Sequence, residues 1–205
     1  MQYGFMPRLM WAAFAPGFKA ALPMITDDDA ERTMRAAKAR YQSILAKVNE
    51  FDRDDRFLVN ILSGAMLAAV YIGLSQKPDV DTLGQYYEKA MDTAVMRRFL
   101  AHKKYYTVKA QAKLKQSAER SRMRTPNPYS WVYDYTPGPD INSYTATFYT
   151  CGLCHLLKSL GIEEITPAMC RYDYVMAEKS NTVFTREYTL ASGGPYCDCH
   201  YKKRK

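Results

Sequence analysis

The chain has 205 residues, of which 47% are hydrophobic and 24% carry a charge. This composition excludes an intrinsically disordered protein, and the length suffices for one domain with a full core. We therefore expect residues 1–205 to form a single domain. The longest apolar run, residues 61–74, is too short to cross a bilayer, so it predicts a buried helix and no membrane partner.

The net charge of +8 comes from two basic segments. Residues 97–124 contain ten Lys or Arg and one acidic residue, and residues 202–205 are all basic, so the rest of the chain is slightly acidic. A basic stretch of this kind is more often a solvated helix face than a nucleic-acid site, and no nucleic-acid-binding motif accompanies it. Nucleic-acid binding is therefore the weakest of three functional hypotheses.

Residues 1–25 form an apolar N-terminal arm. Pro16 and Lys19 interrupt the apolar run and no small-residue cleavage site follows, which argues against a signal peptide. The aromatic residues Trp11, Phe14 and Phe18 would either cover this chain's own core or pack against a second subunit of a homo-oligomer. The sequence leaves both arrangements open.

Residues 26–124 are predicted to be helical. Thr26 and the three aspartates after it are typical of a helix start, because hydroxyl and carboxylate groups stabilise the free amides there. Apolar residues at spacings of three and four predict one helix as far as Val48 and a second from Leu58 towards Pro78. A third helix is predicted from Leu83 into the basic stretch.

Residues 125–205 follow a different pattern, because Pro126 and Pro128 end the helical part. Aromatic and β-branched residues predict four strands. These are residues 129–135, 144–150, 181–190 and 196–201. Two short helices, residues 155–160 and 163–179, lie between the strand pairs. The sequence thus predicts an α+β fold, in which long N-terminal helices pack on an antiparallel sheet of about four strands with two short inserted helices.

All five cysteines lie in this last part, at positions 151, 154, 170, 197 and 199. An odd number without a disulfide pattern agrees with a reducing compartment, so we expect a cytoplasmic protein. Cys170 and Asp173 are three residues apart and share a helix face. On the last strand Cys197 and Cys199 would share one face, and Asp198 the other.

The order of these motifs resembles a known family. C-x-x-C at 151–154, C-x-x-D at 170–173 and F-x-R-x-x-T-L-A-x-G-G-x-x-C-D at 184–198 are similar to the signature of the L-2-amino-thiazoline-4-carboxylic acid hydrolase family. That family is similar in turn to 4-vinyl reductase-type ligand-binding domains, whose terminal Glu, Cys and Cys help to hold a structural zinc. Here Arg186 and Thr189 stand at the first two of those positions and only Cys197 remains. The resemblance therefore argues against the same zinc site.

The resemblance implies a hydrolase that opens a small cyclic amidine or isothiourea acid, such as L-2-amino-thiazoline-4-carboxylate, to N-carbamoyl-L-cysteine. This reaction requires a nucleophile, an acid or base, and a cation for the carboxylate. Candidates for these roles are Cys197 or Cys170 as nucleophile, Asp173 or Asp198 as general base or orienting group, and Arg186 with Thr189 as substrate-binding residues.

Each candidate also has a purely structural explanation. Cys197 could fill the core face of a strand, Asp173 could face solvent, and Arg186 could pair with Asp198 across two strands. The alternative function is a small-molecule sensor domain that binds its ligand without turnover. We expect no cofactor, although the Cys-x-Cys-His string of Cys197, Cys199 and His200, with Cys151 and Cys154, supplies enough soft ligands to keep zinc as a minority alternative.

Overall fold

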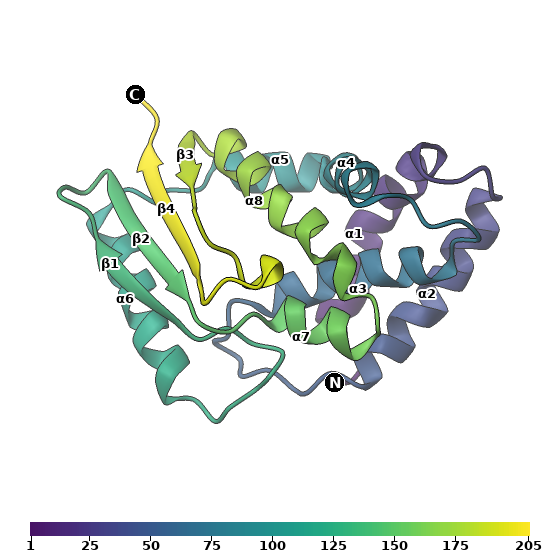
Figure 1. The fold of residues 1–205 in the computed structure, drawn as a ribbon, viewed down its shortest axis with the longest axis horizontal. Coiled ribbons are helices and arrows are strands. Elements are labelled where there is room, and N and C mark those ends of the chain that lie inside the picture. Colours follow the sequence, from purple (N-terminus) through teal and green to yellow (C-terminus); the bar gives the residue numbers. More distant parts are fainter.

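The computed structural model describes residues 1–205 and contains eight α-helices and one antiparallel sheet of four strands (Figure 1). The helices are α1 (Phe5–Ala21), α2 (Ala30–Ala46), α3 (Leu58–Gly73), α4 (Val80–Met91), α5 (Ala94–Ala101), α6 (Val108–Met123), α7 (Gly152–Ser159) and α8 (Thr166–Lys179). The strands are β1 (Tyr133–Pro137), β2 (Ser143–Phe148), β3 (Thr182–Thr185) and β4 (Cys197–Lys203). Short 3-10 turns are η1 (Leu22–Met24), η2 (Glu163–Ile165) and η3 (Leu190–Ser192). The predicted α+β fold, with two short helices inserted between strand pairs, is confirmed.

Helix α3 lies at the centre of the main core. Its residues 61–71 are all buried, because this helix is apolar on every side and needs neighbours all around it. Helices α2 and α7 pack on α3, and α1 packs on α4, which in turn packs on α8. No helix has both the length and the apolar character needed to cross a membrane.

The sheet has the strand order β1-β2-β4-β3, with every neighbouring pair antiparallel. In this register Ala146 of β2 lies opposite Cys199 of β4, and Phe184 of β3 lies opposite Tyr201. Helix α6 covers β1 and α8 packs against β3 (Figure 1). The other long helices pack mainly on one another around α3, not on the sheet as we expected.

The predicted helix boundaries need two corrections. Asp29, and not Thr26, caps α2, because the Asp29 carboxylate accepts a hydrogen bond from the Arg32 amide at 2.7 Å. The third predicted helix is three helices, α4, α5 and α6. The hydroxyls of Thr93 and Thr107 accept hydrogen bonds from amides three residues ahead, so each begins a new helix inside an otherwise helical pattern.

Two predicted strands are shorter than their alternating patterns. Tyr129 and Trp131 precede β1 and pack into the helical core, where the Tyr129 hydroxyl donates to the Lys47 carbonyl at 3.2 Å. Strand β3 ends at Thr185, and the amides of Glu187 and Tyr188 bond to the Asp198 side chain and not to a strand.

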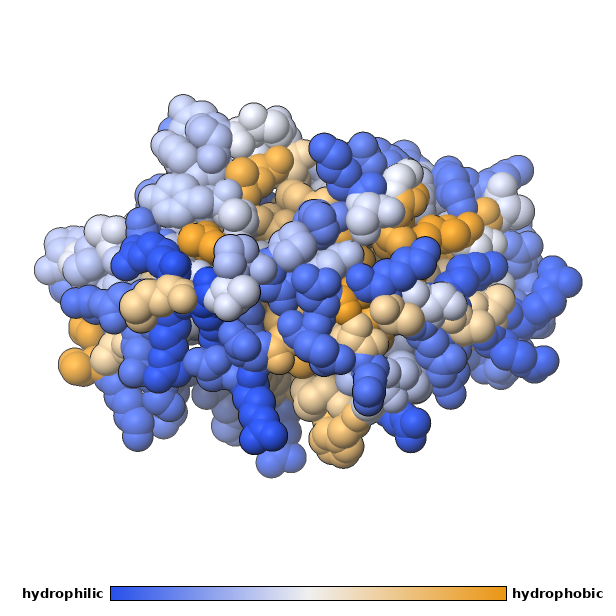
Figure 2. Space-filling model, turned by 90° about the horizontal axis from the view of Figure 1, so that it is seen from below, coloured by the Kyte–Doolittle hydropathy of each residue, from blue (hydrophilic) through white to orange (hydrophobic).

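The N-terminal arm covers this chain's own core. It forms helix α1, in which Trp11, Phe14 and Phe18 are buried. The Phe18 ring lies 5.8 Å from the ring of Tyr86, whose hydroxyl donates to the Phe18 carbonyl at 3.1 Å. Packing against a second subunit, the other predicted arrangement, would have left the apolar face of α1 exposed on this chain. The face of the molecule seen in Figure 2 is mainly hydrophilic, with apolar residues scattered in small groups.

The packing of α1 predicts that Phe18→Ala destabilises the protein. Because Phe18 is fully buried, its truncation should lower the free energy of unfolding by about 3–5 kcal/mol. Phe5→Ala is the matched control, since Phe5 lies in the same helix and is 76% exposed. Urea unfolding followed by circular dichroism measures both variants. Equal stability of the two would show that α1 does not belong to the cooperative core.

Candidate functional site

The five cysteines come together at the junction of α7, α8 and β4, and all are free thiols. They are close enough that the thiols of Cys170 and Cys197 affect the pKa of Cys154, and Cys197 affects that of Cys199. Cys199 is buried and the other four are half-buried. The structure thus joins the two predicted nucleophiles, Cys170 and Cys197, to three thiols that we had not selected.

The C-x-x-C segment begins helix α7. Gly152 allows the start of α7 to lie against the backbone of Tyr129, because a Cβ atom at residue 152 would lie only 2.0 Å from the Tyr129 carbonyl oxygen. Cys151 precedes the first turn and Cys154 lies within it, at the end of the helix where free amides favour negative charge. A C-x-x-C pair at a predicted helix start was the sequence signal that could have selected Cys154.

The bonded pair of Cys151 and Cys154 favours one thiolate, and the position of Cys154 in the first turn of α7 favours it there. A hydrogen bond from the Cys151 thiol lowers the pKa of Cys154, although burial and the neighbouring thiols oppose this shift. The same bond, together with burial, raises the pKa of Cys151. Burial also raises the pKa of Cys197, and raises that of Cys170 and of Cys199 to about 12. A negative charge on one thiol further disfavours ionisation of the others.

Arg186 and Asp173 form an ion pair beside the thiols, in which the Asp173 side chain is 38% exposed. The Arg186 side chain is only 7% exposed, and its Nη1 atom lies 2.9 Å from an Asp173 carboxylate oxygen. Its Nη2 atom donates to the Cys170 carbonyl at 2.7 Å. The guanidinium also lies over the rings of Tyr174 and Phe184, at 5.2 and 5.4 Å. Arg186 therefore links the end of β3 to α8.

The two charges of this pair shift the pKa values of neighbouring groups in opposite directions. Burial raises the pKa of Asp173, while the Arg186 charge opposes that rise. The Asp173 charge raises the pKa of Cys170 and Cys199, and Arg186 lowers both. A carboxylate with a raised pKa is better suited to accept and return a proton near neutral pH. Two of the five Arg186 donors are engaged, so its role towards a substrate carboxylate stays a prediction.

Asp198 lies on the other face of β4 and organises the turn before it. Its carboxylate accepts hydrogen bonds from the amides of Tyr188 at 2.6 Å and Glu187 at 3.1 Å. Burial alone would raise the pKa of Asp198, but these amides outweigh it and lower the pKa. The structure does not bring Asp198 to the thiols, because successive residues of a strand face opposite sides. Asp198 does not pair with Arg186.

Thr189 and Gly193 shape the same turn. The Thr189 hydroxyl accepts a hydrogen bond from the Ser192 amide at 3.1 Å, and Gly193 adopts a left-handed conformation with φ of 79°. The Leu190 amide then donates to the Cys197 sulfur at 3.2 Å. Much of the terminal motif thus positions Cys197, and a role of Thr189 in substrate binding stays a prediction.

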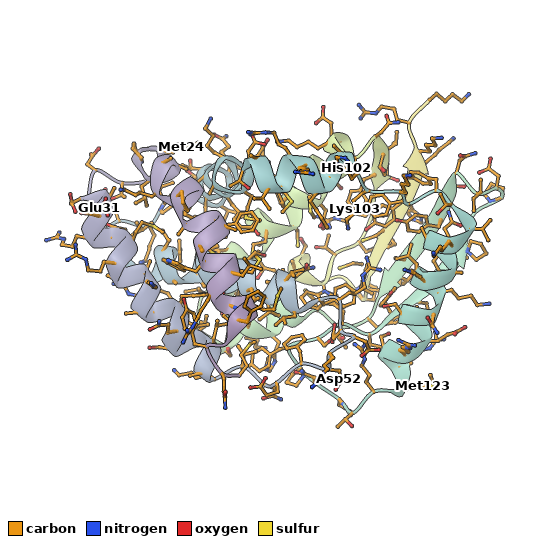
Figure 3. All side chains as sticks on the ribbon, turned by 180° about the vertical axis from the view of Figure 1, so that it is seen from behind. Met24, Glu31, Asp52, His102, Lys103 and Met123 are labelled. Atoms are coloured by element: carbon orange, nitrogen blue, oxygen red, sulfur yellow. The ribbon has the colours of Figure 1, made fainter.

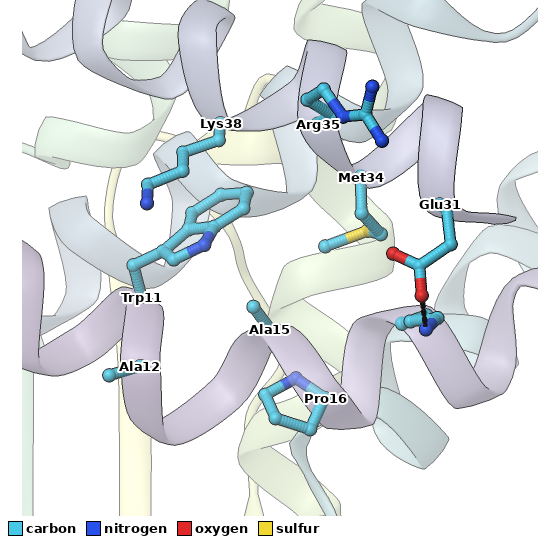
Figure 4. Close-up of a pocket in the computed structure, with 9 residues that line it drawn as sticks. Trp11, Ala12, Ala15, Pro16, Glu31, Met34, Arg35 and Lys38 are labelled. Atoms are coloured by element: carbon cyan, nitrogen blue, oxygen red, sulfur yellow. Dashed lines mark hydrogen bonds and ion pairs between the residues drawn. The ribbon is translucent and has the colours of Figure 1, made fainter.

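Two cavities lie away from the thiols. One, of about 480 Å³, lies between α1 and α2, where Trp11, Met34 and the ion pair of Lys19 and Glu31 line it (Figure 4). The other, of about 550 Å³, lies against α6. Neither contains a cysteine. No three His, Cys, Asp and Glu side chains are arranged to hold a metal ion, and His200 is exposed on the face opposite Cys199.

Comparison with known proteins gives one match, which covers more than half of the chain. The family described as L-2-amino-thiazoline-4-carboxylic acid hydrolase matches residues 59–201. The chain belongs to this family. No curated protein and no solved structure matches it. The matched region of the family begins in α3 and ends in β4, so it includes all five thiols and the pair of Arg186 and Asp173.

The two contacts of Arg186 predict that lysine cannot replace it in this family member. Arg186→Lys keeps the charge but cannot bond both Asp173 and the Cys170 carbonyl, so we expect a loss of about 1–3 kcal/mol in unfolding free energy. Arg171→Lys is the control, because Arg171 is half exposed and pairs with the exposed Asp81. Its effect should stay within about 0.5 kcal/mol. Equal losses in chemical unfolding would contradict the linking role of Arg186.

The lowered pKa of Cys154 predicts an order of thiol reactivity. Because the thiolate is the reactive form, Cys154 should be alkylated by iodoacetamide at a lower pH than the other four cysteines. Mass spectrometry of peptides after brief labelling between pH 6 and 9 measures the order. Alkylation of Cys170 or Cys197 before Cys154 would contradict it, and Cys154→Ser controls for secondary labelling.

Proposed function

We propose that this protein is a hydrolase that opens a small cyclic amidine or isothiourea acid, of which L-2-amino-thiazoline-4-carboxylate is the model substrate. The observation that carries the proposal is the group of five thiols around one ion pair, in which a single thiol has a lowered pKa. Membership of the hydrolase family supports the reaction class. The substrate itself is part of the proposal.

The reaction adds one water to the ring carbon that carries the amino group and breaks its bond to the ring sulfur. In the proposed route a thiolate attacks this carbon, and the ring sulfur leaves and takes up a proton. The product of this step is an isothiourea joined to the protein through sulfur. Water then adds to the same carbon, and loss of the protein thiolate leaves the urea group of N-carbamoyl-L-cysteine.

Cys154 is the favoured nucleophile, because it lies in the first turn of α7 and its bond with Cys151 lowers its pKa. Cys197 and Cys170 remain candidates, since either thiol could ionise once a substrate changes the local charge. Asp173 would accept the proton of the attacking water, and the unengaged donors of Arg186 would hold the substrate carboxylate. The dense packing around Arg186 would also keep the carboxylate in one orientation.

A binding domain without turnover is the second candidate. Two observations favour it. Four of the five thiols have raised pKa values, and Arg186 already has Asp173 as its counter-ion. In that case the same residues would recognise the ring and the carboxylate, and the ligand would leave unchanged. Turnover separates the two candidates.

The test is release of free thiol from L-2-amino-thiazoline-4-carboxylate by the purified protein, corrected for the protein's own thiols. We expect turnover, and Cys154→Ser should reduce kcat by more than about a hundredfold. Cys170→Ser and Cys197→Ser are the comparison variants. Loss of kcat only in one of these would keep the hydrolase and replace its nucleophile. No thiol release by the native protein, together with a rise in melting temperature on adding the compound, would establish the binding domain.

A further inference from the structure

The cavity of about 550 Å³ beside α6 is strongly basic. It is bounded by α6, by residues 54–56 and by the segment that follows α5, where Lys103 lies on the side towards α6 (Figure 3). Five cations line it, against the single carboxylate of Asp54. These are Arg56, Lys103, Lys113, Arg120 and Arg124. None of its lining residues belongs to the thiol-bearing part of the chain.

Two of the five cations are already neutralised. Arg120 Nη1 lies 2.9 Å from an Asp54 carboxylate oxygen. Arg124 lies 2.9 Å from both Asp54 and Asp55, and the Asp55 side chain is only 3% exposed. These ion pairs form one wall of the cavity and hold the 54–56 loop against the end of α6.

The other three cations, Arg56, Lys103 and Lys113, have no carboxylate within ion-pair distance. Lys103 is half-buried, with its Nζ atom 4.3 Å from the ring centre of Phe99 and 5.1 Å from that of Tyr105. Burial, and then repulsion by Arg56, lower the pKa of Lys103 to about 8. The like charges of Lys103 and Arg56 repel each other without a counter-ion, which costs free energy, and an anion between them would recover it.

The rest of the lining suits an organic molecule. Tyr105, Ala110 and Leu114 offer apolar surface, while Gln116 and Ser117 offer hydrogen bonds. The volume falls in the range of small-ligand sites, which are concave and combine apolar walls with a few polar groups. A nucleic-acid surface would instead follow the exposed cations along α6.

We propose that this cavity binds a small organic anion with two or more negative charges, held by Arg56, Lys103 and Lys113. Phosphate and carboxylate groups share the required chemistry. The site is separate from the thiols, because a row of tyrosine rings lies between them. The ring centres are 6.4 Å apart from Tyr105 to Tyr106, 6.2 Å from Tyr106 to Tyr144, and 4.8 Å from Tyr144 to Tyr201. The proposal is independent of the hydrolase reaction.

The test measures binding of inorganic pyrophosphate and of citrate to the full chain by isothermal titration calorimetry at one low ionic strength. We expect at least one of them to bind, and Lys103→Ala or Lys113→Ala to weaken that binding at least about tenfold. Lys115→Ala is the matched control, since Lys115 lies on α6 next to the cavity but does not line it. Its affinity should stay within about twofold of the native value.

The relative affinity of the two probes assigns the ligand to the phosphates or to the carboxylates. The proposal is overturned if neither probe binds to the native protein. It is also overturned if Lys115→Ala weakens binding as much as Lys113→Ala does, because the anion would then be attracted by the whole helix. Tighter binding of single-stranded DNA, weakened equally in both variants, would assign the surface to nucleic acid. Thermal unfolding of each variant shows whether weaker binding comes from a loss of folding, and we expect melting temperatures close to that of the native protein.

Discussion

The buried guanidinium of Arg186 is the constraint on which the C-terminal half depends. A buried charge without its partners is very costly, so Asp173 and the Cys170 carbonyl must stay beside it. These contacts fix α8 against the end of β3, and they bring Cys170 towards Cys197 and Cys199 on β4. This ion pair thus links β3 to α8 and contributes to the pKa values of Cys170 and Cys199.

Most residues of the terminal motif shape the backbone of one turn. Asp198, Thr189 and Gly193 satisfy or permit the turn between β3 and β4, and Cys197 accepts the amide that closes it. Such a turn explains why these residue types occur in this order without each one touching a substrate. The thiols of Cys197 and Cys199 lie on the opposite side of β4 from Asp198, and a charge on one thiol disfavours ionisation of the other.

The basic segment has a similar division of roles. Between the end of α5 and the end of α6 the charges look uniform along the sequence, but they differ in their partners. Arg120 and Arg124 are neutralised by the loop at residues 54–55, whereas Lys103 is held between aromatic rings and near Arg56. The basic residues at this cavity therefore fall into two groups, those in structural ion pairs and those without a carboxylate partner.

The sequence by itself determined the fold class, the four strands and the family. Periodicity is a local property, and a motif whose residues lie close in the chain can be recognised there. The change from helical spacing to alternation at the two prolines placed the sheet correctly. It also predicted that Cys197 and Cys199 share one face of β4, because side chains alternate along any strand.

Only the tertiary structure decided which candidates meet. Arg186 pairs with Asp173 and not with Asp198, which lies on the neighbouring strand β4. The reason is that β3 ends before Arg186, so that the Arg186 side chain turns towards α8. The pairing of Arg186 with an acid 13 residues away and the lowered pKa of Cys154 depend on burial and on charges from several elements. The same holds for the breaks at Thr93 and Thr107 and for the burial of α1. A local sequence pattern does not contain these contacts, helix breaks and pKa shifts, because they arise from the three-dimensional environment.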